Sequence, residues 1–275
     1  KKIDGNDFNG SYGRIFPMTG LLLTTPLINK KYNITLTPKL FGVINSSQSN
    51  SNKISNEEST DYKYTLLNFT DLSRFTGTDK LENSKRLSYG IDLYTNRFKA
   101  ELGQSYEFDK DRNNYTKNVG LNDYMSDLLG SSSYDGDSND IGYNFRFNVD
   151  QGLMASESLS FSNDSLLGNF GLGYSRSRKE VNSILEKGSE TLNVGFGSEK
   201  FLNYSTVSFN GIFDLVEDDP TNYKFSYNYL DECFGIDLNF ERSFYEDRDL
   251  KPKDILTLMF SFKYLGTYKS TNLAV

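Results

Sequence analysis

The chain has 275 residues and a formal net charge of −7, with no histidine, no tryptophan and a single cysteine. Without histidine, Ser-His-Asp and Cys-His nucleophilic sites and histidine-ligated metals are excluded, and one cysteine cannot build a zinc or iron–sulfur site. The acidic balance argues against nucleic acid as a partner. Hydrophobic residues make up only 36% of the chain but aromatic residues 15%, so we expect either partial disorder or an unusual solvent on one face.

Apolar residues occupy alternate positions along most of the chain, as in the stretch DIGYNFRFNVD at residues 140–150. A period of two predicts β-strands with one apolar face, and the period of a helix is nearly absent. In chain order we expect about 13 strands, at residues 14–25, 32–45, 85–95, 98–109, 126–134, 140–150, 154–162, 168–178, 189–198, 204–216, 222–230, 233–245 and 254–265.

The predicted strands are about ten residues long, which is the length of a tilted strand that crosses a bilayer. A β-sandwich would show the same alternation, but aromatic residues crowd the strand ends, where membrane barrels carry interfacial girdles. These residues are Phe98, Tyr106, Phe108, Tyr223 and Tyr264. We therefore predict an all-β fold, an antiparallel transmembrane β-barrel. Its lipid-facing set includes Ile141, Tyr143, Phe145, Phe147, Leu192, Val194, Phe196, Phe209, Leu238, Leu258, Phe260 and Phe262.

The connections between the predicted strands alternate between short and long, and the two longest cover residues 46–84 and 110–125. Outer-membrane barrels place short turns in the periplasm and long loops outside. We therefore expect loop 46–84 to be extracellular and the turn at Cys233 to be periplasmic. By this parity the first strand starts outside, whereas a complete bacterial barrel has an even strand count and both termini in the periplasm. The chain is thus expected to be the C-terminal part of a larger barrel.

Loop 46–84 and the strand after it contain KISNEESTDYKYTLLNFTDLSRFTGTDKLENSKRLSYG, residues 53–90. Taken alone, this is a polar loop with a hydrophobic patch. We expect Phe69, Leu72 and Phe75 to pack over the barrel mouth, with Arg74 and Asp79 in polar contacts.

The spacing of charged, aromatic and glycine residues in this segment resembles the signature of the LptD family, the lipopolysaccharide-assembly proteins of the outer membrane. Glu58 stands where the family has Asp, Lys80 where it has Arg, and Ser55 where Pro is usual. The positions that carry the resemblance are Asn56, Glu57, Glu58, Ser59, Arg74, Phe75, Gly77, Asp79, Glu82, Arg86, Tyr89 and Gly90.

The C-terminal segment resembles the same family through Cys233, Arg242 and the stretch FKYLG at residues 262–266. The family often has two adjacent cysteines, and here Glu232 occupies the second position. The resemblance implies a disulfide between Cys233 and a cysteine of an N-terminal periplasmic region outside this sequence, a bond that oxidising compartments favour. A buried free cysteine is the alternative.

The resemblance further implies that residues 1–275 form the C-terminal half of an LptD barrel of roughly 26 strands, without the N-terminal periplasmic jellyroll. The implied function is translocation of lipopolysaccharide and its insertion into the outer leaflet of the bacterial outer membrane, without enzymatic chemistry or a cofactor. The lipid would leave through a lateral seam at the last strand, 254–265. The residues of this strand singled out for the seam are Leu256, Thr257, Leu258, Phe260, Ser261 and Phe262.

The implied partners are lipopolysaccharide, an LptE-like plug lipoprotein in the lumen, an LptA-like periplasmic bridge reached through the missing N-terminal domain, and outer-membrane lipid. Composition alone leaves a second interpretation open, that of a porin or another outer-membrane barrel transporter.

Overall fold

The computed structural model describes residues 2–274 except 4–5, 8–12, 46–49, 51–53, 55, 57, 60–62, 110–114, 116–118, 122, 182–183, 199–203, 245–251, 265 and 270–272. Every regular element in the described residues is a β-strand. Among the same residues, no helix has the length and apolar character needed to span a membrane.

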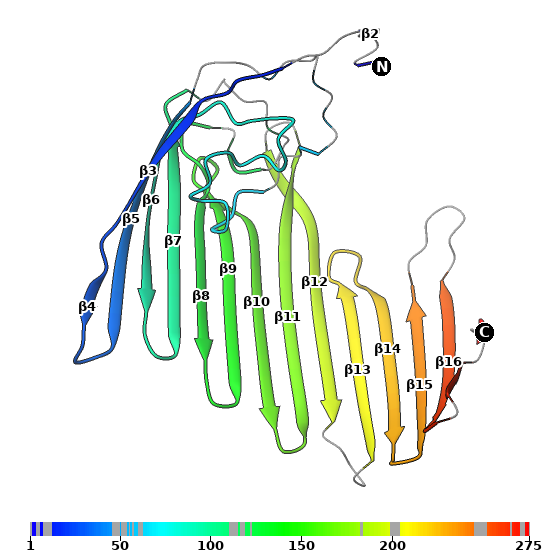
Figure 1. The fold of residues 1–275 in the computed structure, drawn as a ribbon. Helices are drawn as coiled ribbons and strands as arrows, with labels where there is room; N and C mark the ends of the chain where they lie inside the picture. Colours follow the sequence, from blue (N-terminus) through cyan, green and yellow to red (C-terminus); the bar gives the residue numbers. More distant parts are fainter. Residues whose placement is uncertain are drawn as a thin grey trace. The chain divides into compact units, whose positions relative to one another are not determined.

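One antiparallel sheet of 16 strands contains almost all of the described strands, in the order β17-β16-β15-β14-β13-β12-β11-β10-β9-β8-β7-β6-β5-β3, with β4 also on β5 and β18 also on β16 (Figure 1). A separate pair is formed by β1 (Lys2–Ile3) and β2 (Asn6–Asp7). The strands of the sheet are β3 (Met18–Thr24), β4 (Leu27–Asn29), β5 (Ile34–Asn45), β6 (Lys85–Tyr94), β7 (Phe98–Glu107), β8 (Leu128–Asp135), β9 (Asn139–Asn148), β10 (Leu153–Ser165), β11 (Gly168–Val181), β12 (Ile184–Ser198), β13 (Ser205–Asp214), β14 (Asp219–Leu230), β15 (Phe234–Ser243), β16 (Lys253–Phe262), β17 (Gly266–Lys269) and β18 (Leu273–Ala274).

Each predicted strand corresponds to a strand of the sheet, so the prediction of an all-β antiparallel fold is confirmed. The ends differ by a few residues. The predicted strand 14–25 begins only at Met18, and the predicted strand 222–230 begins earlier, at Asp219. Strand β14 starts early because its pairing with β13 continues past a shift in register between Ile212 and Phe213. Beyond that shift, Pro220 pairs with Phe213 and Asp219 with Asp214.

The chain divides into two compact units. The first contains residues 1–133, 144–157 and 178–187, and the second contains residues 134–143, 158–177 and 188–275.

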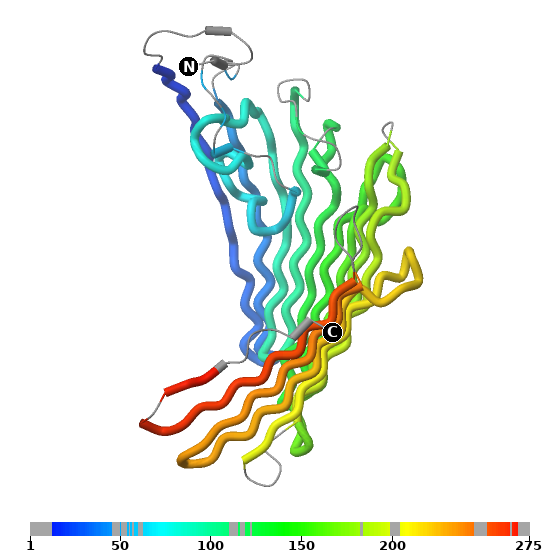
Figure 2. The backbone as a smooth tube through the Cα atoms, turned by 90° about the vertical axis from the view of Figure 1, so that its right-hand side faces the viewer, coloured from blue at the N-terminus to red at the C-terminus, as the bar shows by residue number. Residues whose placement is uncertain are grey.

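In the first unit the sheet is largely polar on the face that is covered, where Phe41 and Val43 of β5 are apolar exceptions, and apolar on the face that is open. Along β6, Ser88 is buried while its neighbours Tyr89 and Ile91 are 38% and 37% exposed. Residues 63–84 lie on the buried face of β5–β7, called here the polar face, and form the cyan coil in Figure 2. Such an inversion of the usual pattern of a soluble protein is expected when the open face meets lipid.

In the second unit, apolar side chains of neighbouring strands stand in register on one face. Phe209 pairs with Phe225, Phe225 with Phe240, and Phe240 with Leu256. Polar rungs alternate with these apolar ones, as at Ser226, which pairs with Asn239 and donates a hydrogen bond to its Oδ1 at 2.7 Å. The predicted lipid-facing residues of this unit follow the apolar rungs, and each is half-buried or exposed.

The C-terminal end of the sheet corrects one expectation. The sequence predicts that the strand at 254–265 is the last one, so that its outer edge has no further strand of this chain beside it. Instead β17 pairs with that edge of β16 from Met259↔Lys269 to Phe262↔Gly266, and β18 pairs with it at Ile255 and Leu256. The alternation of apolar and polar residues at 253–262 predicts β16, whereas β17 and β18 are too short for alternation to be recognised in the sequence.

The two faces of β9 generate the first prediction. Phe145 lies on the apolar face, where its ring covers Gly130 of β8: a Cβ built on that glycine would lie 2.0 Å from Phe145 Cε1. Asn144 points to the opposite face and is exposed. We expect Phe145→Arg to lower the free energy of unfolding in lipid vesicles by about 2–4 kcal/mol, and Asn144→Arg to lower it far less. Equal tolerance of both substitutions in denaturant titrations would contradict a lipid-facing assignment.

Candidate functional site

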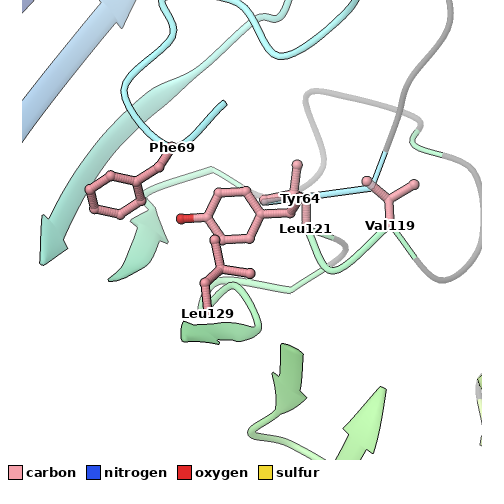
Figure 3. Close-up of a cluster of buried hydrophobic side chains, with 5 residues drawn as sticks. All are labelled: Tyr64, Phe69, Val119, Leu121 and Leu129. Carbon is pink, nitrogen blue, oxygen red and sulfur yellow. The ribbon is translucent and has the colours of Figure 1, made fainter. Parts of the chain in front are cut away.

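The loop is anchored on the sheet by a small apolar cluster of Tyr64, Phe69, Val119, Leu121 and Leu129 (Figure 3). Phe69 reaches the strands themselves, at a point where β6 and β7 pair glycine with glycine, Gly90↔Gly103. A Cβ built on Gly103 would lie 2.8 Å from Phe69 Cε2. The two glycines therefore provide the space in which the ring of Phe69 packs against the sheet.

The centre of the site is the Glu82 carboxylate, which is completely buried and is bound by Arg74 of the same loop. The Arg74 backbone N–H donates to Glu82 Oε2 at 2.8 Å, and Arg74 Nε donates to Oε1 at 2.9 Å. Arg74 Nη2 also donates to Oε1, and Arg74 Nη1 donates to Ser105 Oγ of β7 at 3.2 Å. Because the guanidinium group binds both the loop and a strand, it ties the loop to the sheet.

A second guanidinium group approaches the same carboxylate from the sheet. Arg86 Nη1 lies 3.2 Å from Glu82 Oε2, and both side chains are 0% exposed. Arg86 Nη2 donates to the backbone carbonyl of Asp71, and the Tyr115 hydroxyl donates to Glu82 Oε1 at 2.6 Å. The ring of Tyr115 stacks on Phe75 with centroids 5.3 Å apart. Glu82 is thus held by two arginines and a tyrosine, which offset the cost of burying its charge.

The pKa of Glu82 reflects this balance. Burial by itself raises the pKa of the carboxyl group, but the charges of Arg74 and Arg86 and the hydrogen bonds from Arg74 and Tyr115 lower it from 4.5 to about 2. Burial, and then the neighbouring Glu82 charge, raise the pKa of Tyr115 well above its usual value. Tyr115 therefore remains a hydrogen-bond donor to an ionised Glu82 at neutral pH.

The first part of the predicted signature folds onto the second. Asn56 Oδ1 accepts a hydrogen bond from the Ser59 N–H at 3.1 Å, and Ser59 Oγ accepts one from the Lys80 N–H at 2.9 Å. Asp79 Oδ2 accepts from the Glu58 N–H at 2.8 Å.

Gly77 lies where these two parts meet. It has a φ of +66°, and a Cβ built there would lie 2.8 Å from the Cβ of Glu58. A side chain at this position would therefore face both backbone strain and a steric clash. The predicted signature positions Glu57 and Ser55 lie outside the described residues.

A second polar group fixes the loop that follows β7. Arg146 Nη1 of β9 donates to the Val119 carbonyl at 2.6 Å, and Arg146 Nε lies 3.4 Å from Asp127 Oδ2. Asn148 Nδ2 donates to Asp127 Oδ1 at 2.9 Å. The Val119 carbonyl also accepts from the Tyr64 N–H at 2.9 Å. This group therefore joins residues 63–84 and the connection after β7 to strand β9.

The structure supports the predicted contacts of loop 46–84 except at one residue. Phe69 and Phe75 are buried, and Arg74 and Asp79 make the polar contacts just described. Leu72 is 41% exposed, although its Cδ2 would lie 2.6 Å from a Cβ built on Gly20.

Two predicted site residues, Tyr89 and Cys233, do not join the Glu82 network. Tyr89 points to the apolar face, where its hydroxyl donates to Gln104 Oε1 at 2.8 Å. Cys233 lies in the second unit, in the turn between β14 and β15, and its thiol is exposed and free. Asp231 Oδ1 accepts hydrogen bonds from the N–H groups of Cys233 and Phe234 at 2.7 Å each and holds this turn. The exposure of the thiol does not favour the alternative of a buried free cysteine.

Sequence reasoning did not select Ser105, Tyr115, Asp127 and Arg146 as site residues. Arg146 is a cation on the polar side of a strongly alternating strand, which is a weak signal for a partner. Tyr115 lies in a connection without periodicity, and Asp127 lies at the start of the predicted strand 126–134, so their roles emerge only from the fold. Among the described residues no group of three or more acidic or cysteine side chains is placed to bind a metal ion.

An antiparallel sheet that exposes an apolar face and buries polar side chains beneath a loop is typical of outer-membrane β-barrel proteins. The comparison with known protein families supports this class, and the matched segment contains the residues that hold the loop on the sheet. The family model described as LptD, LPS transport system D, matches residues 7–217. The chain belongs to the LptD family, which is a family of lipopolysaccharide-transport proteins and not of enzymes. The family match includes the whole Glu82 network and ends before Cys233.

Among solved structures, a double mutant of the Rh. blastica porin aligns over 94% of this chain and 88% of its own, with 10% identity and a TM-score of 0.41. A triple mutant of the Rhodopseudomonas blastica porin aligns over 94% and 87%, with 9% identity and the same TM-score. Likenesses this slight carry no functional information. No curated protein matches the sequence.

The network predicts the effect of neutralising Glu82. Glu82→Gln leaves Arg74 and Arg86 buried without their counter-ion, and loss of one partner of a buried ion pair costs about 3–5 kcal/mol. We expect the Tyr64 N–H, which is bonded to Val119, to exchange with solvent about a hundredfold faster or more in hydrogen-exchange measurements. The matched control is Glu58→Gln, because Glu58 lies in the same loop with an exposed side chain. Equal exchange in both variants would contradict a loop held by Glu82.

The same carboxyl group predicts a response to acid. The pKa of Glu82 is lower in the folded loop, at about 2, than its ordinary value of 4.5. Its contribution to stability is therefore complete above pH 4.5 and is lost as the pH falls towards 2. Cleavage of the loop by an acid-active protease should rise steeply across this window. Glu82→Gln should be cleaved readily throughout and lose the pH dependence, whereas a wild-type loop that stays equally protected at both ends of the window would refute this role.

Proposed function

We propose that the protein translocates lipopolysaccharide across the bacterial outer membrane and inserts it into the outer leaflet. Membership of the LptD family supports this function. The observation that carries the proposal further is the Glu82 network, which holds the signature loop on the polar face of the sheet. A loop fixed there narrows the space that this face borders, so a bulky lipid is directed sideways instead of along the strands.

Sideways exit suits the chemistry of the substrate. Lipopolysaccharide joins a polar sugar chain to hydrocarbon chains, and the two faces of this sheet are polar and apolar. At an opening between two strands, the sugars can stay on the polar face while the hydrocarbon enters lipid. The strands at such an opening must separate, because the lipid cannot pass an intact ladder of hydrogen bonds.

We place this seam at the outer edge of β16, which carries the predicted residues Leu256, Thr257, Leu258, Phe260, Ser261 and Phe262. The pairing along the two edges of β16 supports this choice. β15 pairs with it over the whole strand, from Phe234↔Phe262 to Ser243↔Lys253. The other edge holds only the short strands β17 and β18. Fewer ladder hydrogen bonds need to break there, and β17 and β18 would have to move when the seam opens.

The remaining parts of the proposal follow from the family. The chain is the C-terminal half of a barrel of roughly 26 strands, whose N-terminal jellyroll receives lipid from an LptA-like periplasmic bridge. An LptE-like lipoprotein lies against the polar face. Cys233 forms a disulfide with that N-terminal region, and its exposed position in the turn after β14 leaves the sulfur accessible to a partner.

Deleting residues 56–79 tests the role of the loop. The deletion removes Arg74 and the other signature residues from Asn56 to Asp79 but none of the strands. In cells depleted of their own copy, we expect the full-length deletion variant to be inserted in the outer membrane and to deliver much less lipopolysaccharide to the surface, measured with a surface-acting lipid A-modifying enzyme. Glu58→Gln serves as the control. Normal delivery by the deletion variant would refute a role for this loop in export.

A cross-link tests the seam. A bond between a cysteine at position 261 and one at position 267, its partner on β17, should stop export, because that edge can no longer separate. A matched pair of cysteines joining β15 and β16 at Asn239↔Thr257 should leave export unchanged. If protein cross-linked at the seam still delivered lipopolysaccharide at the normal rate, the exit would lie elsewhere.

A further inference from the structure

A groove of about 580 Å³ runs along the apolar face of the first unit, across β3, β5 and β6. Its position follows from the register. On one rung Leu21 pairs with Gly42, and Gly42 pairs with Leu87. A Cβ built on Gly42 would have no atom within 4 Å. The missing side chain between two leucines therefore forms the floor of the groove.

The next row of paired residues towards the long loops ends the groove, and it includes a charged side chain. Here Thr19 pairs with Ile44 and Ile44 with Lys85, and the Phe108 N–H donates to the Lys85 carbonyl at 2.9 Å. Lys85 and Phe108 both line the groove. No carboxylate of the described residues lies within ion-pair distance of the Lys85 ammonium group.

Aromatic rings mark the same level of the sheet. Tyr106 lies edge-on to Phe108 with centroids 5.2 Å apart and stacks on Tyr124 with centroids 6.2 Å apart. Phe108 is 61% exposed. Exposed aromatic rings at a strand end are typical of the depth at which lipid headgroups begin. Lys85 thus lies at the level of the headgroups, and Gly42 lies deeper, at the level of hydrocarbon.

We propose that this groove binds a phospholipid with an anionic headgroup, with one acyl chain over Gly42 and the phosphate at Lys85. The volume falls within the range of small-molecule sites, and its lining is apolar except at the end that carries the cation. Arg86 also lines the groove, but its guanidinium group contacts Glu82 beneath the loop. The one remaining cation of the described lining, Lys85, matches a lipid with one phosphate. Lipid A has two phosphates and several chains, most of which would lie outside the groove.

The experiment uses the full-length protein in mixed micelles with photoactivatable phosphatidylglycerol, and cross-linked peptides are identified by mass spectrometry. We expect cross-links at residues 19–23, 40–44 and 85–87. Lys85→Gln should reduce labelling of these peptides about fivefold, the effect of one cation near a phosphate. Gly42→Leu fills the groove and should reduce labelling at least as much.

Two matched controls should leave the labelling unchanged. Lys30→Gln removes a cation from the turn at the opposite end of the strands, and Ala100→Leu adds hydrocarbon to the apolar face of β7 outside the groove. If Gly42→Leu fails to insert, Lys85→Gln alone decides the matter.

Competition identifies the occupant. Unlabelled phosphatidylglycerol should displace the probe at lower concentration than phosphatidylcholine or lipopolysaccharide. Displacement by lipopolysaccharide at equal or lower concentration would overturn the proposal in favour of a glycolipid site. Uniform labelling of the apolar face, unaffected by Lys85→Gln, would overturn it in favour of ordinary bilayer contact.

Discussion

The burial of one carboxylate, that of Glu82, is the constraint on which the folded loop depends. An isolated buried charge is too costly to keep, so the chain must bring compensating groups to it. One arginine comes from the loop and the other from β6, and a tyrosine comes from the next connection. The three partners belong to three different segments, so satisfying Glu82 also places those segments relative to one another.

An ion network has this role because the sheet offers the loop few apolar side chains. Its strands turn most of their apolar side chains to the open face. The face under the loop carries mainly serine, arginine, aspartate and glycine, and its apolar side chains include Phe41 and Val43 of β5. The apolar cluster around Tyr64 and Phe69 is correspondingly small. In a soluble protein a hydrophobic core would hold such a loop. Here charge pairing and glycine-lined space replace much of that core. Arg74, Glu82 and Arg86 of the signature provide the charge pairing, and Gly90 provides part of the space.

The alternation of apolar and polar residues predicts the sheet well, because every second side chain meets a different solvent over about ten residues. It also predicts which residues face outward, including Phe145 and Phe260. Short elements such as β17 and β18 escape this reasoning because two to four residues cannot show a period. The signature identified Arg74, Glu82 and Arg86, but the sequence does not show that they meet one carboxylate. Their contact depends on how the loop returns to β6, and the share of Tyr115 depends on a second loop.

The same division of polar and apolar faces connects the loop, the groove and the outer edge of β16. A soluble sheet buries its apolar face, so an amphiphile has no continuous route from one face to the other. In this sheet the apolar face meets lipid and the polar face meets the loop, so any gap between strands is a boundary between water and hydrocarbon. Such a gap presents unpaired N–H and C=O groups to lipid, which is strongly unfavourable unless a polar molecule fills it. Sugar hydroxyls can donate and accept hydrogen bonds in place of a neighbouring strand. Under the proposed sideways exit, a strand edge held by few pairs, as at β17 and β18, parts more readily when a glycolipid occupies it than when it faces lipid alone.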